Sequence, residues 1–170
     1  FDFFFGDREQ FMTSVESEAS TLALDWRERL AAGPTGVAAL LETAPMLCSD
    51  MMLRSFFEAY AIVADVIASG DASRPPGESA LLDQCMGLGQ QYLLQGRLRS
   101  PEAVSRHLFR AGIELARNRG LGSPMEGIND HRREIAASLQ AVLRRLSVVH
   151  RIAVQRVEHA LRAAAGGERR

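Results

Sequence analysis

The feature that most constrains the fold is a long apolar stretch, MMLRSFFEAYAIVADVIA, at residues 51–68. Ser49 or Asp50 can cap a helix that starts here and runs to about Ser69. The sequence of this helix is apolar nearly all round. A helix without a wide polar face is buried on several sides. We therefore predict that it is the central helix of the domain.

The chain before this stretch has the pattern of an amphipathic helix followed by a short one. Asp7 and Gln10 have the spacing of a capping box, and Gly33 with Pro34 ends the helix that they start. A short helical stretch follows at 37–42. The apolar positions of the first helix are spaced alternately by four and three residues, which places them on one face: Phe11, Val15, Ala19, Leu22, Trp26 and Leu30.

Two more helices follow the loop SGDASRPPGES. The first is predicted over 80–94. The second has a strong start, with Ser100 as N-cap, Pro101 at the first helical position and Glu102 in the first turn, and it ends at Gly120. The predicted inward positions of the two helices are Leu81, Leu82, Cys85, Leu88, Tyr92 and Leu93, then Val104, Leu108, Phe109, Ile113 and Leu115.

A long helix is predicted after the second loop, GSPMEGIND. Asn129 or Asp130 caps it, and it extends to about Ala165. Its apolar positions are close to a heptad repeat. Such a helix either packs back on the domain, which we favour, or pairs with a second copy, so a homodimer stays open. The seam consists of Ile135, Leu139, Val142, Leu146, Val149, Ala153, Val157 and Ala160.

The N-terminal segment FDFFF holds four of the eight phenylalanines of the chain. It is either a short strand, whose partners would lie upstream, or an apolar arm packed on the helices. We interpret Phe1 as a position inside a longer protein and not as a natural start. Residues 1–6 are then the end of an upstream domain.

Composition excludes some classes of protein. The chain has 170 residues, of which 46% are hydrophobic and 24% charged, as in an ordinary globular domain. Its net charge of −1 argues against a nucleic-acid binder. Cys48 and Cys85 are either reduced core residues, which we favour, or one disulfide. No apolar run reaches the roughly 18–20 residues of a membrane span, while attachment to a membrane surface stays open.

No catalytic constellation is evident among the histidines, which are His107, His131, His150 and His159. His131 and Glu134 lie one helical turn apart, as metal ligands can, but no second ligand pair accompanies them. We favour a solvated helix face there, and no cofactor is predicted. The arginine-rich stretch at 132–162 alternates with apolar residues and could contact anionic lipid, although a solvated face is again favoured.

Three stretches in order resemble bacterial membrane-bound glycerol-3-phosphate acyltransferases of the PlsB type. The first, FDFFFGDREQFMTSVESEAS, is similar to the segment that follows the catalytic domain in that family. The second, MLRSFFEAYAIVADVIAS, is similar to its apolar helix. The third, QQYLLQGRLRSPEAVSRHLFRAGIELARNRGL, is similar to a helix, a turn and a second helix that ends in glycine. The resemblance extends from Phe1 to about Leu121.

The resemblance implies transfer of a fatty acyl group from acyl-CoA or acyl-carrier protein to the 1-hydroxyl of sn-glycerol 3-phosphate, at the cytoplasmic face of the cell membrane. In this family a histidine acts as general base, and an aspartate that follows after four intervening residues orients it. The positions five residues after the four histidines hold no aspartate, so the catalytic residues are expected upstream of Phe1. These positions are Gly112, Ala136, Gln155 and Ala164.

The prediction is an all-α fold, an irregular bundle of five to six helices with one short strand-like segment at the N-terminus. It divides into residues 1–6, which end an upstream acyltransferase domain, a helical domain at 7–127, and a long helix with its tail at 128–170. Its expected role is structural support without catalytic residues of its own. The alternatives are a ligand-binding or dimerisation domain of a bacterial regulator and a small metal enzyme that uses His131 and Glu134.

Overall fold

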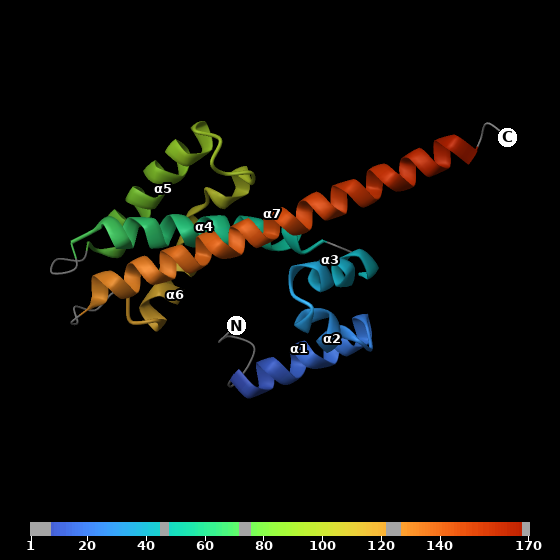
Figure 1. Ribbon diagram of the computed structural model, residues 1–170. Helices are drawn as coiled ribbons and strands as arrows, with labels where there is room; N and C mark the ends of the chain where they lie inside the picture. Colours follow the sequence, from blue (N-terminus) through green and yellow to red (C-terminus); the bar gives the residue numbers. More distant parts are fainter. Residues whose placement is uncertain (1–7, 45–47, 72–75, 122–126, 168–170) are drawn as a thin grey trace. The chain divides into compact units, whose positions relative to one another are not determined.

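The computed structural model describes residues 8–44, 48–71, 76–121 and 127–167. All regular structure in these ranges is helical, which confirms the predicted all-α fold (Figure 1). The predicted strand-like segment and the Asp7 cap lie outside the described residues. The helices are α1 (Arg8–Leu22), α2 (Trp26–Ala31), α3 (Pro34–Thr43), α4 (Ser49–Ser69), α5 (Glu78–Leu94), the 3₁₀ helix η1 (Pro101–Ala103), α6 (Arg106–Asn118) and α7 (Ile128–Gly167).

The chain forms two compact units, each of which is described by itself. One unit comprises Phe1–Leu47 together with Val149–Arg170, and the other comprises Cys48–Val148. The long helix α7 is therefore divided: its residues up to Val148 belong to the unit Cys48–Val148, and its residues from Val149 belong to the unit that contains Phe1–Leu47. The three-part division of the chain inferred from the sequence stays a prediction.

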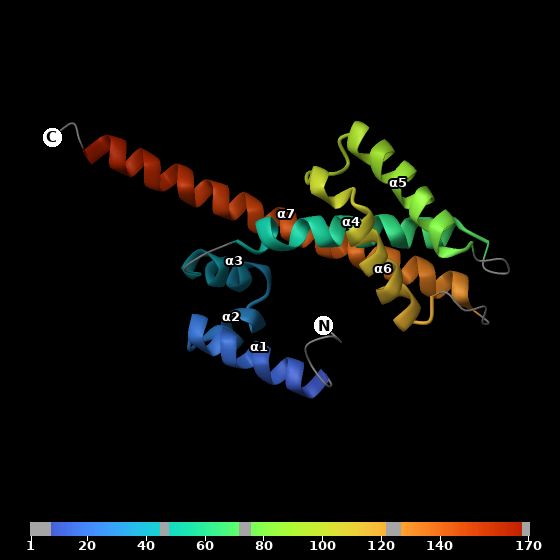
Figure 2. The ribbon, with the colours of Figure 1, turned by 180° about the vertical axis from the view of Figure 1, so that it is seen from behind.

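Helix α4 is the centre of the unit Cys48–Val148, because α5, α6 and η1 all pack against it. In both views of the ribbon, α4 lies beside α5 and α6 (Figures 1 and 2). Gly112 of α6 allows a close approach, since a Cβ there would lie 3.0 Å from Tyr60 and 3.1 Å from Val63. The buried core consists of Ala59, Ile62, Val63, Val66, Leu82, Cys85, Ala103, Phe109 and Ile113.

The first half of α7 joins this unit through a smaller apolar cluster. Ile128 is buried together with Ala116 and Leu121, and Ile67 and Ile135 pack against them. The helix begins at Ile128, directly after Gly127 with φ 74°, so Asn129 and Asp130 lie inside its first turn rather than before it. The seam is buried or partly buried up to Ala153, whereas Val157 and Ala160 are exposed. The choice between packing back and pairing with a second copy stays a prediction.

The first predicted helix is interrupted. It ends at Leu22, and α2 begins at Trp26. Thr21 donates its hydroxyl to the Ser17 carbonyl at 3.1 Å, a type of bond that weakens a helix end. The break lets Trp26 become buried and donate its Nε1–H to Ser20 Oγ at 3.1 Å. In the same unit, Arg156 of α7 donates to the Ala44 carbonyl at the end of α3, at 2.6 Å.

The predicted helix start at Ser100 gives only the three residues of η1. Val104 leaves the helical conformation with ψ 72°, and Ser105 then precedes α6 in an extended conformation. The reason is tertiary, because a carboxylate of α4 binds the backbone on the N-terminal side of this turn and Ala103 is fully buried. The N-cap of α4 is Cys48, whereas Asp50 lies in the first turn and accepts a hydrogen bond from Arg54.

Candidate functional site

None of the four histidines, all of which are among the described residues, is buried. His107 is exposed on α6, and His159 is exposed on α7. His131 Nδ1 lies 3.9 Å from Glu134 Oε2 on the surface of α7, as the one-turn spacing predicts. Within the described ranges, no group of three or more histidine, cysteine, aspartate or glutamate side chains is placed to hold a metal ion.

The most unusual polar feature is a line of three buried charged side chains on α4. Asp50 is 6% exposed, Arg54 6% and Glu58 2%. Arg54 Nε donates to Asp50 Oδ1 at 2.6 Å, and Arg54 Nη1 donates to Glu58 Oε1 at 3.4 Å. Their spacing of four residues places them on one helical face. We call Asp50, Arg54 and Glu58 the α4 charge ladder.

The α4 charge ladder connects three parts of the unit. Glu58 accepts the backbone N–H groups of Arg99 and Ser100, each at 3.0 Å, and so holds the segment before η1. Arg54 Nη2 donates to Ser147 Oγ of α7 at 3.1 Å. Burying charges is unfavourable unless they are paired and hydrogen-bonded. The ladder meets this condition through its ion pairs and its backbone contacts.

Sequence reasoning missed this ladder because α4 was interpreted as apolar nearly all round. The signal was present in the sequence as acid, base and acid at positions 50, 54 and 58. That spacing on an exposed helix is an ordinary stabilising pattern. Only the packing of α7 and of the η1 segment shows that this face is the buried one.

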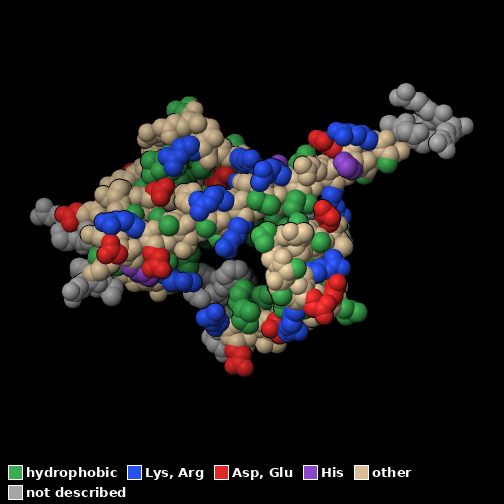
Figure 3. All heavy atoms as spheres, in the orientation of Figure 1, with side chains coloured by type: hydrophobic (Ala, Val, Ile, Leu, Met, Phe, Trp, Pro, Cys, Tyr) green, Lys and Arg blue, Asp and Glu red, His purple; other side chains and the backbone are tan. Residues whose placement is uncertain are grey.

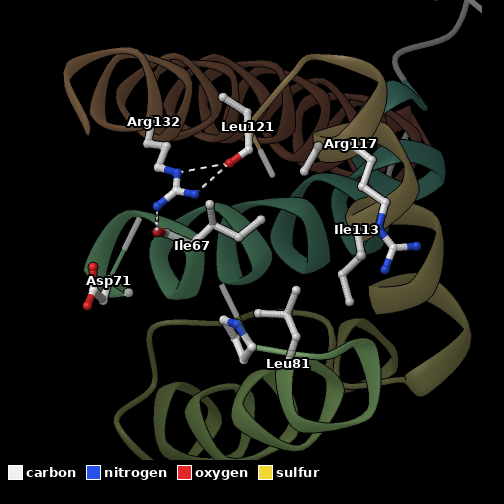
Figure 4. Close-up of a pocket in the computed structure, with 10 residues that line it drawn as sticks. Ile67, Asp71, Leu81, Ile113, Arg117, Leu121 and Arg132 are labelled. Atoms are coloured by element: carbon white, nitrogen blue, oxygen red, sulfur yellow. Dashed lines mark hydrogen bonds between the residues drawn. The ribbon is translucent and has the colours of Figure 1, made fainter. Parts of the chain in front are cut away.

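A second buried charge, Arg132 of α7, binds the ends of two other helices. Its Nε and Nη2 donate to the Leu121 carbonyl at 2.9 and 2.7 Å, and its Nη1 donates to the Ile67 carbonyl at 3.3 Å (Figure 4). Leu121 follows α6, and Ile67 is in the last turn of α4. The C-terminal end of a helix carries partial negative charge, which favours a cation at this position.

A cavity of about 210 Å³ lies beside Arg132. Figure 4 shows Ile67, Leu81 and Ile113 around it. Arg117 also lines the cavity, and its Nη1 pairs with Glu78 Oε2 at 2.8 Å. The described lining residues are mostly apolar and include no pair of nucleophile and base. The remaining lining residues are Gly70, Asp71, Pro76, Ala116 and Leu121.

Two other titratable groups in this unit favour their neutral forms. Burial raises the pKa of the Cys85 thiol to about 12, so it is protonated at neutral pH and is a poor nucleophile. Burial and then the charge of Asp65 raise the pKa of Tyr92, whose hydroxyl donates to Asp65 Oδ2 at 3.1 Å. Both cysteines are free thiols, with Cys85 buried and Cys48 partly buried.

Exposed arginines follow the outer face of α7. Arg144, Arg145 and Arg151 are exposed, and Val148 between them is 41% exposed. Figure 3 shows basic side chains along this helix with hydrophobic ones between them. None of the described helices is both long enough and apolar enough to cross a lipid bilayer.

The sequence matches the family model described as the glycerol-3-phosphate acyltransferase C-terminal region over residues 1–124. The chain belongs to this family. The match ends before α7, so the glycerol-3-phosphate acyltransferase C-terminal region comprises α1 to α6 here. The resemblance inferred from three short stretches is thereby confirmed. No solved structure gives a significant match to the chain.

Curated relatives extend the comparison beyond the C-terminal region. The chain is 31% identical over 155 residues to a Mycobacterium bovis protein named "Putative acyltransferase plsB1", and it is equally similar to proteins of that name from two strains of Mycobacterium tuberculosis. The aligned part is 90% of this chain and 25% of each relative. The chain therefore spans about a quarter of the length of these acyltransferases.

Proposed function

We propose that this chain is the C-terminal helical region of a membrane-associated glycerol-3-phosphate 1-O-acyltransferase. The whole protein would transfer a fatty acyl group from acyl-CoA or acyl-carrier protein to sn-glycerol 3-phosphate and form lysophosphatidate for phospholipid synthesis. The observation that carries this proposal is the family match over residues 1–124 in a chain that spans a quarter of its acyltransferase relatives. This match favours the acyltransferase over a regulator domain.

In this proposal the chain supports catalysis without catalytic residues of its own. An upstream domain supplies a histidine and an aspartate separated by four residues, and the histidine takes the proton of the substrate hydroxyl. The contacts of the buried charges support this division of roles. Glu58 and Arg132 bind backbone groups. Asp50 and Arg54 bind side chains of the same unit. Within the described ranges, no buried side-chain nitrogen or oxygen lacks a hydrogen-bond partner.

The proposal also assigns the three parts of the chain and their surroundings. Residues 1–6 end the upstream domain, residues 7–127 form the helical support, and residues 128–170 form the long helix and its tail. The protein is peripheral or monotopic at the cytoplasmic face of the membrane. The exposed arginines of α7 support contact with an anionic surface, because each basic residue near such a surface contributes about 1 kcal/mol.

The test compares acyl transfer by the full-length protein and by the 170-residue chain. Each is incubated with radiolabelled sn-glycerol 3-phosphate and either acyl-CoA or acyl-carrier protein, and lysophosphatidate is quantified. We expect turnover by the full-length protein and none by the chain. A full-length variant with the upstream histidine replaced by alanine is the control and is expected to be inactive. Turnover by the pure chain, or none by the full-length protein, would refute the proposal.

A further inference from the structure

The N-terminal half of α4 is inverted relative to an ordinary surface helix. Its charged side chains, the α4 charge ladder, are at most 6% exposed. Its large apolar side chains face outward instead. Met51 is 82% exposed, Met52 64%, Leu53 42% and Phe56 43%. We call these four residues the α4 apolar face.

Part of this face belongs to an apolar stripe of α4. Farther along the helix, other elements of the unit bury the same stripe. Met52 and Phe56 are followed by Ala59 and Val63 at spacings of three and four, so all four lie on one side of α4. Ala59 and Val63 are at most 1% exposed, and Val63 lies against Gly112 of α6. Helix α6 has 13 residues and α4 has 21, so α6 is about 12 Å shorter. The apolar stripe of α4 therefore extends beyond the part of the helix that α6 can bury.

Four large apolar side chains within six positions are an unfavourable surface for a protein in water, and such patches mark interaction sites. Methionine and phenylalanine are also enriched in the cores of protein interfaces, and methionine adapts to irregular partners. The chemistry of the α4 apolar face therefore fits a protein partner.

Charge argues against a lipid partner for this face. Helices that lie on membranes have arginine or lysine on the polar side, at the level of the headgroups. Arg54 is the only basic residue at 48–57, and it is buried in the α4 charge ladder. The exposed arginines lie on other elements, among them Arg144 and Arg145 of α7.

The length of the relatives favours the upstream domain as the partner. The family to which the chain belongs is a C-terminal region, and the chain spans a quarter of the relatives' length. A domain linked to this region in the same polypeptide has a far higher effective concentration than a second copy in solution. We propose that the α4 apolar face is the surface against which the upstream acyltransferase domain of the same polypeptide packs. This inference rests on the proposed function.

The test uses the full-length protein and oxidation of its methionines by hydrogen peroxide, quantified by mass spectrometry of the peptides. If the upstream domain covers the face, Met51 and Met52 oxidise far more slowly in the native protein than after unfolding in guanidinium. Phe56→Asp places a charge in the contact, so this protection is lost. Met52→Asp is a second variant, for which protection of Met51 is lost. Leu94→Asp is the matched control, because Leu94 is 90% exposed on α5, and protection is retained.

Other occupants give different results. Equal protection of Met51 and Met52 in the folded 170-residue chain indicates cover by the chain's own unit Phe1–Leu47 and Val149–Arg170 and overturns the proposal. Protection that disappears when the protein is diluted to a monomer indicates a second copy and overturns the proposal. Protection that appears only with phosphatidylglycerol vesicles indicates lipid and also overturns it. Acyl transfer is measured on the same samples. An active protein with rapidly oxidised Met51 and Met52 overturns this inference alone, whereas a protected but inactive protein overturns the proposed function alone.

Discussion

At the scale of single residues, the unit Cys48–Val148 depends on charges that are buried and fully engaged. Glu58 neutralises Arg54 and also binds the backbone before η1, while Arg132 binds the backbone after α6 and at the end of α4. In both cases one side chain binds backbone groups from two residues. Such residues are hard to replace, because each substitution leaves other buried groups unpaired.

Glu58→Ala is expected to lower the free energy of unfolding by about 3 kcal/mol, because it leaves the buried Arg54 partly unpaired and removes the acceptor of the Arg99 and Ser100 backbone N–H groups. Chemical denaturation followed by circular dichroism measures the change. The control is Glu114→Ala on the exposed side of α6, for which we expect a change within about 0.5 kcal/mol. Equal effects of the two substitutions would contradict the role given to the ladder.

Arg132 and Arg133 are neighbours with opposite burial, which makes them a matched pair. Arg132 is 3% exposed, whereas Arg133 is exposed and pairs with Asp130 on the surface. Arg132→Met is expected to lower the free energy of unfolding by about 1–3 kcal/mol, because the Leu121 and Ile67 carbonyls both lose the hydrogen bonds from Arg132. The Ile67 carbonyl keeps the Gly70 N–H at 3.4 Å. Arg133→Met is expected to lower the free energy of unfolding by less than about 1 kcal/mol. Thermal unfolding of both variants decides the question, and a larger effect at Arg133 would contradict the assignment.

At the scale of helices, close backbone approaches decide where elements end and how they pack. The turn between α2 and α3 brings Gly36 against the backbone of α2. A Cβ at Gly36 would lie 1.9 Å from the Arg29 carbonyl oxygen, a distance that no real contact has. The sequence marks this region only by Gly33 and Pro34, which predict a helix end but not the contact.

Gly36→Ala is therefore expected to destabilise the unit that contains α2 and α3 by about 1–3 kcal/mol, because the two backbones must move apart. Gly87→Ala is the control on α5, where a Cβ would meet nothing within 4 Å. At Gly87 the better helix propensity of alanine is expected to raise the free energy of unfolding by up to about 1 kcal/mol. Urea titration of each variant measures whether its free energy of unfolding falls or rises. A stabilising Gly36→Ala would show that α2 and α3 are not held at this distance.

At the scale of the whole molecule, burial is unevenly distributed between the two units. The unit around α4 has a core with Ile62, Cys85 and Phe109 fully inaccessible to solvent, whereas α1 has no buried residue. Apolar burial is the main favourable term in folding. The two units are therefore expected to differ in local stability.

Hydrogen exchange of the purified chain tests this expectation. Amides at 59–66 of α4 are expected to exchange at least about a hundredfold more slowly than those of α1, because core helices exchange only through large-scale opening. Mass spectrometry of peptic peptides resolves the two segments. Equal protection of α1 and α4 would contradict the uneven distribution of stability.

The sequence by itself determined the all-α class, the family and the approximate helix positions. Heptad-like and four-three spacings are local patterns, and a helix needs only local hydrogen bonds. The positions of the histidines and their lack of a partner aspartate five residues later were likewise properties of the sequence alone.

The tertiary structure alone decided which face of α4 is buried. Residues 50–56 hold Met51, Met52 and Phe56 outward and Asp50 and Arg54 inward, against the simple rule that apolar side chains are buried. The reason is that Ser147, Arg99 and Ser100 come from distant parts of the chain, and only folding brings their donors and acceptors to the charged side chains. The break at Ala103 and the capping by Arg132 have the same origin, since contacts across 65 residues leave no local signal.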